Sequence, residues 1–80
     1  MKELVFYTRE GCHLCDVAIA DLERIRQVHP FRLTILDLDH DAPEEKRKAY
    51  DWEVPVVELE GRKIMKYRID ETRLVRLLGA

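Results

Sequence analysis

The sequence predicts a single α/β domain, residues 1–80, in which helices flank a four-stranded mixed sheet. Its 80 residues are enough for one hydrophobic core and too few for two. Apolar patterns typical of strands alternate with patterns typical of helices, in the order βαβ, then α, then ββα. A βαβ unit places its two strands in parallel, whereas a hairpin adds antiparallel strands. One mixed sheet accommodates both.

The N-terminal βαβ unit is expected between residues 2 and 38. Residues 4–7 form an apolar run rich in strand-forming residues and predict a buried strand over residues 2–8. Apolar residues then recur at helical spacing from Leu14 to about His29, and Pro30 ends the pattern. Residues 31–38 alternate between apolar and polar side chains and predict the second strand.

The remaining elements are a short helix, a hairpin and a final helix. Asp41 as a capping residue, Pro43 in the first turn and Glu44 predict a helix that runs to about residue 51. Residues 56–59 and 62–66 are expected to be strands joined by a tight turn at residues 60–61. The last helix should begin after Asp70, its N-cap, and end near Leu78.

Composition excludes several classes of function. Hydrophobic residues make up 46% of the chain and charged residues 38%, a balance that argues against disorder. Apolar runs stay far below the roughly 18 residues that span a bilayer, and no secretory signal is visible, so we expect a cytoplasmic protein. With a net charge of −2, no basic field would attract nucleic acid or a membrane surface. We expect a monomer.

The only two cysteines stand close together as Cys12-His13-Leu14-Cys15. A disulfide between them would close a short loop and stabilise the fold by about 2 kcal/mol at most, so a structural staple is a poor explanation. A zinc site needs about four ligands, and His29 and His40 do not lie at the spacing of a zinc finger. No metal site is therefore predicted, and redox chemistry is favoured over metal binding and over inert thiols.

The position of Cys12 favours a reactive thiolate. It follows the first strand directly and lies where the first helix begins, so free backbone N–H groups and the positive end of the helix dipole stabilise its charge. We expect its pKa to fall below the ordinary value of about 8.5. Cys15 lies one turn further on the same face and is expected to be more buried, by Leu14 and Val17. The pair then consists of a nucleophile and a resolving cysteine.

The sequence resembles the glutaredoxin and thioredoxin superfamily, and the small glutaredoxin-like proteins in particular, over nearly the whole chain. The resemblance rests on the strand that leads through residues 7–11 into the two cysteines, and on Val54-Pro55 before residues 56–57. It implies a thioredoxin-like fold and a thiol–disulfide oxidoreductase that reduces protein or glutathione mixed disulfides. The alternative is a redox-sensing or thiol-binding adaptor without turnover. No tightly bound cofactor is expected.

The resemblance also implies roles for individual residues. Pro55 would be a cis-proline that faces the cysteines, and the backbone of Val54 would pair with a bound peptide or with glutathione. Arg9 would help to bind a glutathione carboxylate, and Asp70 would meet the glutathione amine. From the residues alone, Arg9 is equally well a solvated charge. His13 is either an exposed residue without a role or, when protonated, a cation that stabilises the thiolate.

Two features depart from the glutaredoxin pattern. His13-Leu14 replaces the usual Pro-Tyr between the cysteines, and residues 65–70 lack the Gly-Gly that lets backbone approach glutathione closely. We therefore expect glutathione to bind weakly as a co-substrate, and a thioredoxin-type reductase remains the other candidate electron donor.

Two further groups of side chains are expected to be structural. Tyr50 and Trp52 should pack in the core or at its rim rather than form a substrate platform. The acidic residues at positions 37, 39 and 41 should be a solvated strand end that leads into a helix cap rather than a cation site.

Overall fold

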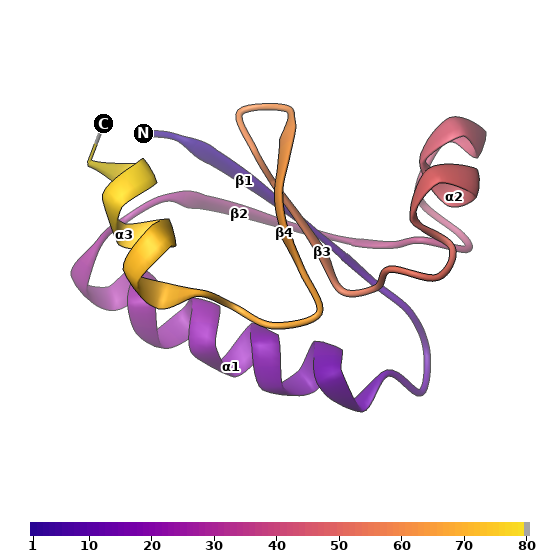
Figure 1. Cartoon of the computed structure of the whole chain (residues 1–80), viewed down its shortest axis with the longest axis horizontal. Helices are drawn as coiled ribbons and strands as arrows, with labels where there is room; N and C mark the ends of the chain where they lie inside the picture. The colour runs from indigo at the N-terminus through magenta and orange to yellow at the C-terminus, as the bar shows by residue number, and fades with distance from the viewer. Residues whose placement is uncertain (80) are drawn as a thin grey trace.

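The computed structural model describes residues 1–79, and in that part of the chain seven elements follow one another in the predicted order (Figure 1). They are β1 (Glu3–Thr8), α1 (His13–Val28), β2 (Arg32–Asp37), α2 (Glu44–Tyr50), β3 (Val56–Leu59), β4 (Arg62–Lys66) and α3 (Glu71–Leu78). None of the helices in residues 1–79 is both long and apolar enough to cross a membrane.

The strands form the four-stranded mixed sheet that the sequence predicts. Their order is β2-β1-β3-β4, in which β1 is parallel to β2 and antiparallel to β3, and β3 is antiparallel to β4. The β3–β4 turn places Glu60 and Gly61 at φ 51° and 80°, the left-handed geometry of a tight hairpin. The thioredoxin-like α/β architecture is therefore confirmed.

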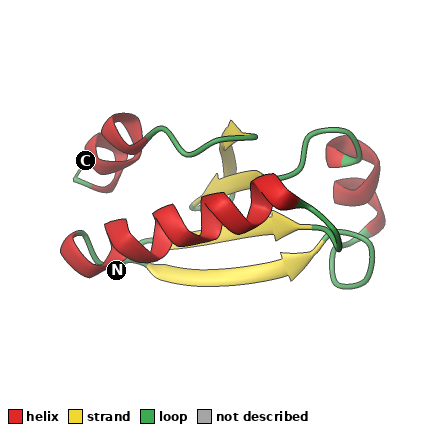
Figure 2. Cartoon of the chain, turned by 90° about the horizontal axis from the view of Figure 1, so that it is seen from below, coloured by secondary structure: helices red, strands yellow, loops and turns green. Residues whose placement is uncertain are grey.

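The main core lies between the sheet and the helices α1 and α3. Successive strand residues point to opposite faces, so Leu4 and Phe6 of β1 face α1 whereas Tyr7 faces away. In Figure 2, α1 crosses the sheet, and α2 stands at the end of the molecule remote from α3. The residues buried in this core are Leu4, Phe6, Cys15, Ala18, Leu22, Ile25, Phe31, Val57, Leu59 and Leu74.

A smaller core lies on the other face, beneath α2. Its buried residues are Tyr7, Leu38, Ala42, Tyr50 and Val56.

Glu58 of β3 adjoins this second core and is only 4% exposed. It accepts hydrogen bonds from the hydroxyls of Tyr50 at 2.7 Å and Tyr7 at 3.3 Å, and it pairs with the Lys46 ammonium at 2.6 Å. Burial opposes ionisation of Glu58, but the contacts with Lys46 and Tyr50 outweigh it and hold the pKa of Glu58 below its ordinary value. This carboxylate fastens α2 to the sheet.

Two local predictions are wrong. Asp41 does not cap α2, because its carboxylate accepts the N–H of Asp37 at 3.0 Å and Pro43 takes the N-cap position without a side-chain cap. Trp52 does not pack in the core or at its rim: it is 88% exposed, whereas Tyr50 is buried as expected. The short α2 ends at Tyr50, so Trp52 lies in the turn beyond it, where no element covers it.

The sheet brings two distant segments to one end of the molecule. Antiparallel pairing places Tyr7, near the end of β1, beside Val56 at the start of β3. The turn that carries the cysteines leaves β1 at this end, and the loop that carries Val54 and Pro55 enters β3 there.

Candidate active site

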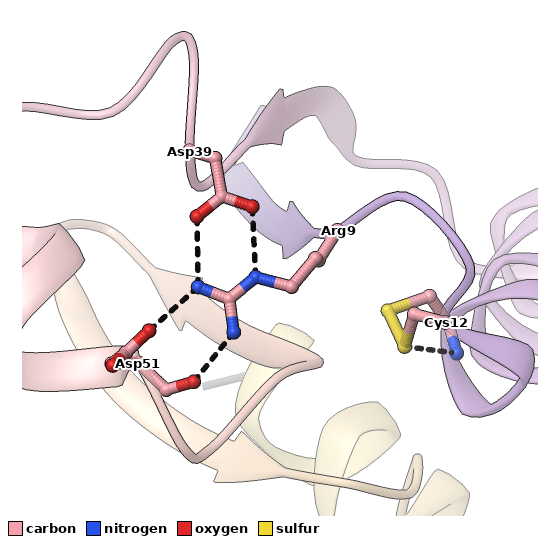
Figure 3. Close-up of a disulfide and its surroundings, with 5 residues drawn as sticks. Arg9, Cys12, Asp39 and Asp51 are labelled. Atoms are coloured by element: carbon pink, nitrogen blue, oxygen red, sulfur yellow. Dashed lines mark hydrogen bonds and ion pairs between the residues drawn. A yellow bond between two sulfur atoms is a disulfide. The ribbon is translucent and has the colours of Figure 1, made fainter.

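Cys12 and Cys15 are joined by a disulfide at the N-terminus of α1, with their Cα atoms 5.2 Å apart (Figure 3). Cys12 is the N-cap residue, and its Sγ accepts the backbone N–H of Cys15 at 3.1 Å. The N–H of Cys12 donates in turn to the carbonyl oxygen of Arg9 at 3.2 Å. The Cys15 N–H also donates to the carbonyl oxygen of Cys12 at 3.2 Å, so the two acceptors share it. The start of the helix therefore directs a backbone N–H group at the sulfur of Cys12, as the sequence predicts.

The two sulfurs differ in burial. Cys15 is 1% exposed and belongs to the main core, whereas Cys12 is half-buried at its rim. The predicted asymmetry is confirmed, but its cause is different. Leu14 and Val17 are 40% and 50% exposed, so the core beneath α1 covers Cys15 rather than these two side chains.

The Val54–Pro55 peptide bond is cis, as predicted, and Pro55 is buried. The carbonyl oxygen of Pro55 accepts the N–H of Tyr67 at 2.7 Å, which joins this loop to the end of β4. Val54 packs against both cores, and Cys12 packs against the main one. The fold thus brings the Val54–Pro55 loop and the cysteine turn to the rim of the same core.

Tyr67 occupies the stretch in which glutaredoxins carry Gly-Gly. Its φ of 69° lies in the left-handed region that favours glycine, and the N–H of Arg68 donates to the carbonyl of Lys66 at 2.8 Å across it. The side chain of Tyr67 is 41% exposed, and its hydroxyl reaches the carbonyl of Trp52 at 3.4 Å. The backbone therefore keeps a glycine-like turn, while the side chain occupies the surface beside it.

A groove of about 430 Å³ starts at the residues between the two cysteines. One wall is α1 between residues 13 and 21, and the other is the stretch 67–69. His13 is exposed and forms part of the groove, so its imidazole lies at the mouth of the cysteine turn. Asp70 lies just beyond the second wall, where its carboxylate caps α3 by accepting the N–H of Arg73 at 3.1 Å. The predicted N-cap role of Asp70 is confirmed.

Arg9 has partners that the sequence did not reveal. Its Nε and Nη2 donate to the two carboxylate oxygens of Asp39, both at 2.8 Å, while Nη2 and Nη1 donate to the side chain and the carbonyl of Asp51, both at 2.7 Å. These contacts, first those to Asp39 and then those to Asp51, raise the pKa of Arg9, and the contact with Arg9 lowers the pKa of Asp39. The guanidinium extends away from the disulfide, between the two aspartates (Figure 3).

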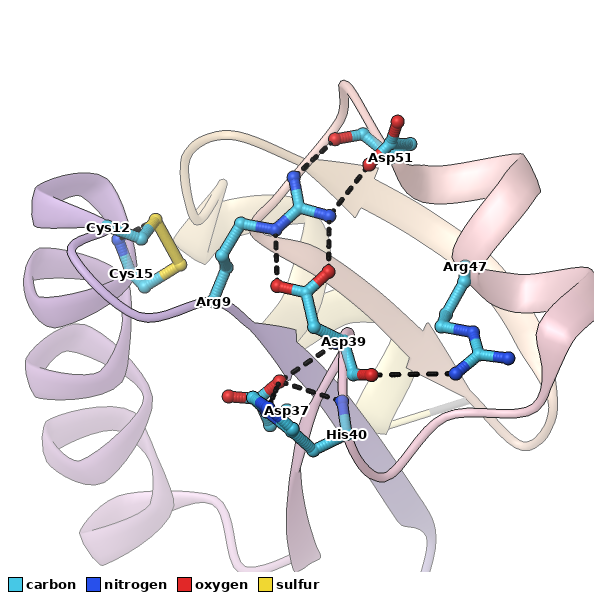
Figure 4. A network of polar contacts seen from close by, with 8 residues as sticks. All are labelled: Arg9, Cys12, Cys15, Asp37, Asp39, His40, Arg47 and Asp51. Carbon is cyan, nitrogen blue, oxygen red and sulfur yellow. Dashed lines mark hydrogen bonds and ion pairs between the residues drawn. A yellow bond between two sulfur atoms is a disulfide. The ribbon is translucent and has the colours of Figure 1, made fainter.

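Residues 37–41 form a hydrogen-bonded turn rather than only a solvated strand end, and Figure 4 shows Asp37, Asp39 and His40 of this turn. Asp37 accepts the N–H groups of Asp39 at 2.8 Å and His40 at 3.1 Å, and Arg47 of α2 donates to the carbonyl of Asp39 at 3.5 Å. This turn places the Asp39 carboxylate against Arg9. Within residues 1–79, no three His, Cys, Asp or Glu side chains are grouped as the ligands of a metal ion would be.

The sequence profile described as "Glutaredoxin-like domain (DUF836)" matches residues 3–79. The chain belongs to this glutaredoxin-like family. Two solved structures are similar to the glutaredoxin-like domain over almost its whole length. Protein Ne2328 from Nitrosomonas europaea is 31% identical with a TM-score of 0.83, and the match covers 95% of this chain and 89% of that one. Protein XcR50 from X. campestris is 32% identical with a TM-score of 0.71, covering 95% of each chain.

Mitochondrial thioredoxin 3 from Saccharomyces cerevisiae, in its oxidized form, is a more distant neighbour. It is 20% identical with a TM-score of 0.71, and the match covers 98% of this chain and 76% of that one. This likeness shows that the glutaredoxin-like domain shares the thioredoxin fold.

Proposed function

We propose that this glutaredoxin-like domain is a thiol–disulfide oxidoreductase that reduces protein disulfides or glutathione mixed disulfides. One observation carries the proposal: the half-buried Sγ of Cys12 accepts an N–H at the start of α1, one turn before the buried Cys15. Hydrogen bonding to the charged form stabilises a thiolate, and the thiolate is the attacking species in disulfide exchange.

The reaction starts from the reduced pair. The Cys12 thiolate attacks one sulfur of the substrate disulfide, the substrate S–S bond breaks, and the departing thiolate takes a proton from solvent. Cys15 then gives its proton to solvent, and its thiolate attacks the Sγ of Cys12. The bond between Cys12 and the substrate breaks, the second half of the substrate leaves as a thiolate that takes a proton from solvent, and the Cys12–Cys15 disulfide remains. The substrate gains two electrons and the cysteine pair loses two. A thiol donor, either glutathione or a thioredoxin-type reductase, returns them.

The substrate would lie across Cys12, the backbone of Val54 and the groove beside α1. A side chain next to the substrate cysteine fits this groove, which the exposed Leu14 and Val17 make partly apolar. Asp70 lies at the end of the stretch 67–69, where the glutathione amine is expected. For a glutathione carboxylate to reach Arg9 it would have to compete with Asp39 and Asp51.

The deciding experiment is reduction of a small mixed disulfide with glutathione in excess. Repeated turnover that Cys12→Ser abolishes supports the oxidoreductase. A stable one-to-one adduct without turnover would instead identify a thiol-binding adaptor. The Cys15→Ser variant serves as the matched control, because it keeps the attacking thiol and removes only the resolving one.

A further inference from the structure

The Arg9 guanidinium joins three segments that meet beside the redox pair. Asp39 lies between β2 and α2, Asp51 follows α2, and Arg9 lies between β1 and α1 (Figure 4). Four of the five N–H donors of a guanidinium are used in these contacts. We call this set of three residues the Arg9 clamp.

The geometry of the clamp differs from that of an ordinary surface ion pair. Isolated exposed pairs contribute little, because both side chains lose freedom and water screens their charges. Here the pair with Asp39 is bidentate, Asp51 adds a carboxylate and a carbonyl, and the Arg9 side chain is only 27% exposed. Bidentate contacts to a planar guanidinium fix orientation as well as distance.

Both the backbone and the side chain of Arg9 contact segments of the candidate active site. Its carbonyl oxygen accepts the N–H of Cys12, so its backbone fixes the start of the cysteine turn. Its side chain holds Asp51, three residues before Val54 in the loop that enters β3. One residue therefore contacts both the turn that carries the attacking sulfur and the loop whose backbone would receive the substrate.

We propose that Arg9 is a positioning residue for disulfide exchange: with Asp39 and Asp51 it holds the Val54–Pro55 loop in register with Cys12, and it is not the ligand of a substrate carboxylate. The inference rests on the proposed oxidoreductase function. Two carboxylates on one guanidinium leave the clamp with a net negative charge, so Arg9 offers no unpaired charge to an anionic substrate. Small displacements of bound groups are costly in reactivity, up to about 100-fold for 1 Å.

The test compares two substrates in single-turnover reduction by the reduced protein. One is the symmetric disulfide of an N-acetylated, C-amidated cysteine tripeptide that carries no charge, and the other is glutathione disulfide. Arg9→Lys keeps the charge but cannot make the bidentate contact and reach Asp51 as well. We expect kcat/KM for the uncharged peptide to fall about tenfold, mostly through the half-saturating concentration, because misplaced docking weakens productive binding.

Three comparisons separate an effect on substrate positioning from a loss of thiol reactivity or of folding. Alkylation of Cys12 by iodoacetamide, which needs no docking loop, should stay within about twofold of wild type. Arg24→Lys is the matched control, because Arg24 also bridges two carboxylates, those of Asp21 and Glu71. Arg24 lies about 18 Å along α1 from Cys12, away from the docking loop. This control variant should keep kcat/KM for both substrates within about twofold of the wild-type values. Asp51→Asn keeps the Arg9–Asp39 pair and provides a second variant should Arg9→Lys fail to fold.

The outcomes separate clearly. If Arg9→Lys loses activity only toward glutathione disulfide, Arg9 is an anion ligand and the proposal is overturned. The proposal is also overturned if kcat/KM for the uncharged peptide stays at the wild-type value, or if the rate of Cys12 alkylation falls in step with kcat/KM. If wild type reduces neither substrate, the proposed function fails, and hydrogen exchange still tests the clamp. Arg9→Lys should then lose protection at the Tyr67 amide, which donates to Pro55, while Arg24→Lys keeps it. Equal protection in both variants would overturn the clamp itself.

Discussion

At the scale of single residues, we expect the difference in exposure between the two cysteines to set the order of attack. Cys12 is half-buried and hydrogen-bonded at the start of α1, and Cys15 is 1% exposed. Limited alkylation of the reduced protein near pH 7, followed by peptide mapping, should therefore label Cys12 first. Cys15→Ser should accumulate mixed disulfides with substrate proteins, because the resolving thiol is missing. Preferential labelling of Cys15 would reverse the assignment of nucleophile and resolver.

Trp52 is an exposed aromatic residue beside the clamp, directly after Asp51. Because it is 88% exposed, Trp52→Ala should change the free energy of unfolding by less than about 0.5 kcal/mol. If Trp52 forms a platform for the substrate, the same variant should weaken docking of a peptide disulfide.

The readout is direct because Trp52 is the only tryptophan. If Trp52 forms the platform, its fluorescence should move to shorter wavelength when a peptide disulfide is trapped on Cys12 in a Cys15→Ser background. Unchanged emission on trapping, together with an unchanged half-saturating concentration in Trp52→Ala, would rule out the platform.

At the scale of elements, we expect the end of β4 and its connection to α3 to control the approach of glutathione. By the resemblance to glutaredoxins, we expect side chains at residues 65–67 to stand where that family presents bare backbone. Each lost backbone hydrogen bond costs about 1 kcal/mol. Two such losses predict an affinity roughly thirtyfold below that of an ordinary glutaredoxin. Calorimetry on a Cys12→Ser, Cys15→Ser variant measures this without covalent capture.

The Tyr67→Gly variant tests whether the Tyr67 side chain causes the weak binding of glutathione. Tyr67 already has a φ of 69°, so glycine fits its backbone without strain while removing the side chain. We expect glutathione to bind about fivefold more tightly, equivalent to one recovered hydrogen bond. Wild-type affinity equal to that of a glutaredoxin measured alongside would show that the missing glycines have no effect.

The elements themselves were largely predictable, because periodicity reports which face of a strand or helix is buried. The order of helices and strands along the chain, the N-cap at Asp70 and the placement of the cysteines at a helix start all follow from local patterns. The cap of α2 did not, because the Asp41 carboxylate accepts the N–H of Asp37, and Pro43 takes the N-cap position before Glu44. Local sequence offers two capping arrangements there, and only the folded turn selects one.

The Arg9 clamp shows why part of the site could not be predicted. Arg9, Asp39 and Asp51 are far apart in the sequence, and no periodicity links them. The acidic run at residues 37–41 was recognisable, but its partner was not. Contacts between loops depend on where the strands end in three dimensions, which for this site is set by the pairing of β1 with both β2 and β3.

At the scale of the whole molecule, several carboxylates couple stability to pH. Hydrogen bonds and ion pairs hold the pKa values of Asp39, Glu53 and Glu58 below their ordinary range; at Glu53 and Asp39 the contacts with Lys63 and Arg9 dominate, whereas at Glu58 they overcome burial. A carboxylate whose pKa is lower in the folded state stabilises the fold above its unfolded pKa of about 4. That stability is lost as pH falls through the folded pKa. The free energy of unfolding should thus stay level from pH 7 to about pH 5 and decline below about pH 4.5.

Glu58→Gln isolates the largest buried contribution to this decline. The variant removes the charge that Lys46 neutralises, and Lys46 is 28% exposed and can partly turn to water, so we expect a loss of about 1–3 kcal/mol at pH 7. Because glutamine does not titrate, the two stability curves should converge as pH falls below about 4. Glu44→Gln is the control, on the helix α2 that also carries Lys46: its contact with Lys48 is exposed, so it should shift stability by less than about 0.5 kcal/mol. Urea unfolding between pH 3 and pH 7 measures all three proteins, and parallel curves for wild type and Glu58→Gln would contradict the assigned role of Glu58.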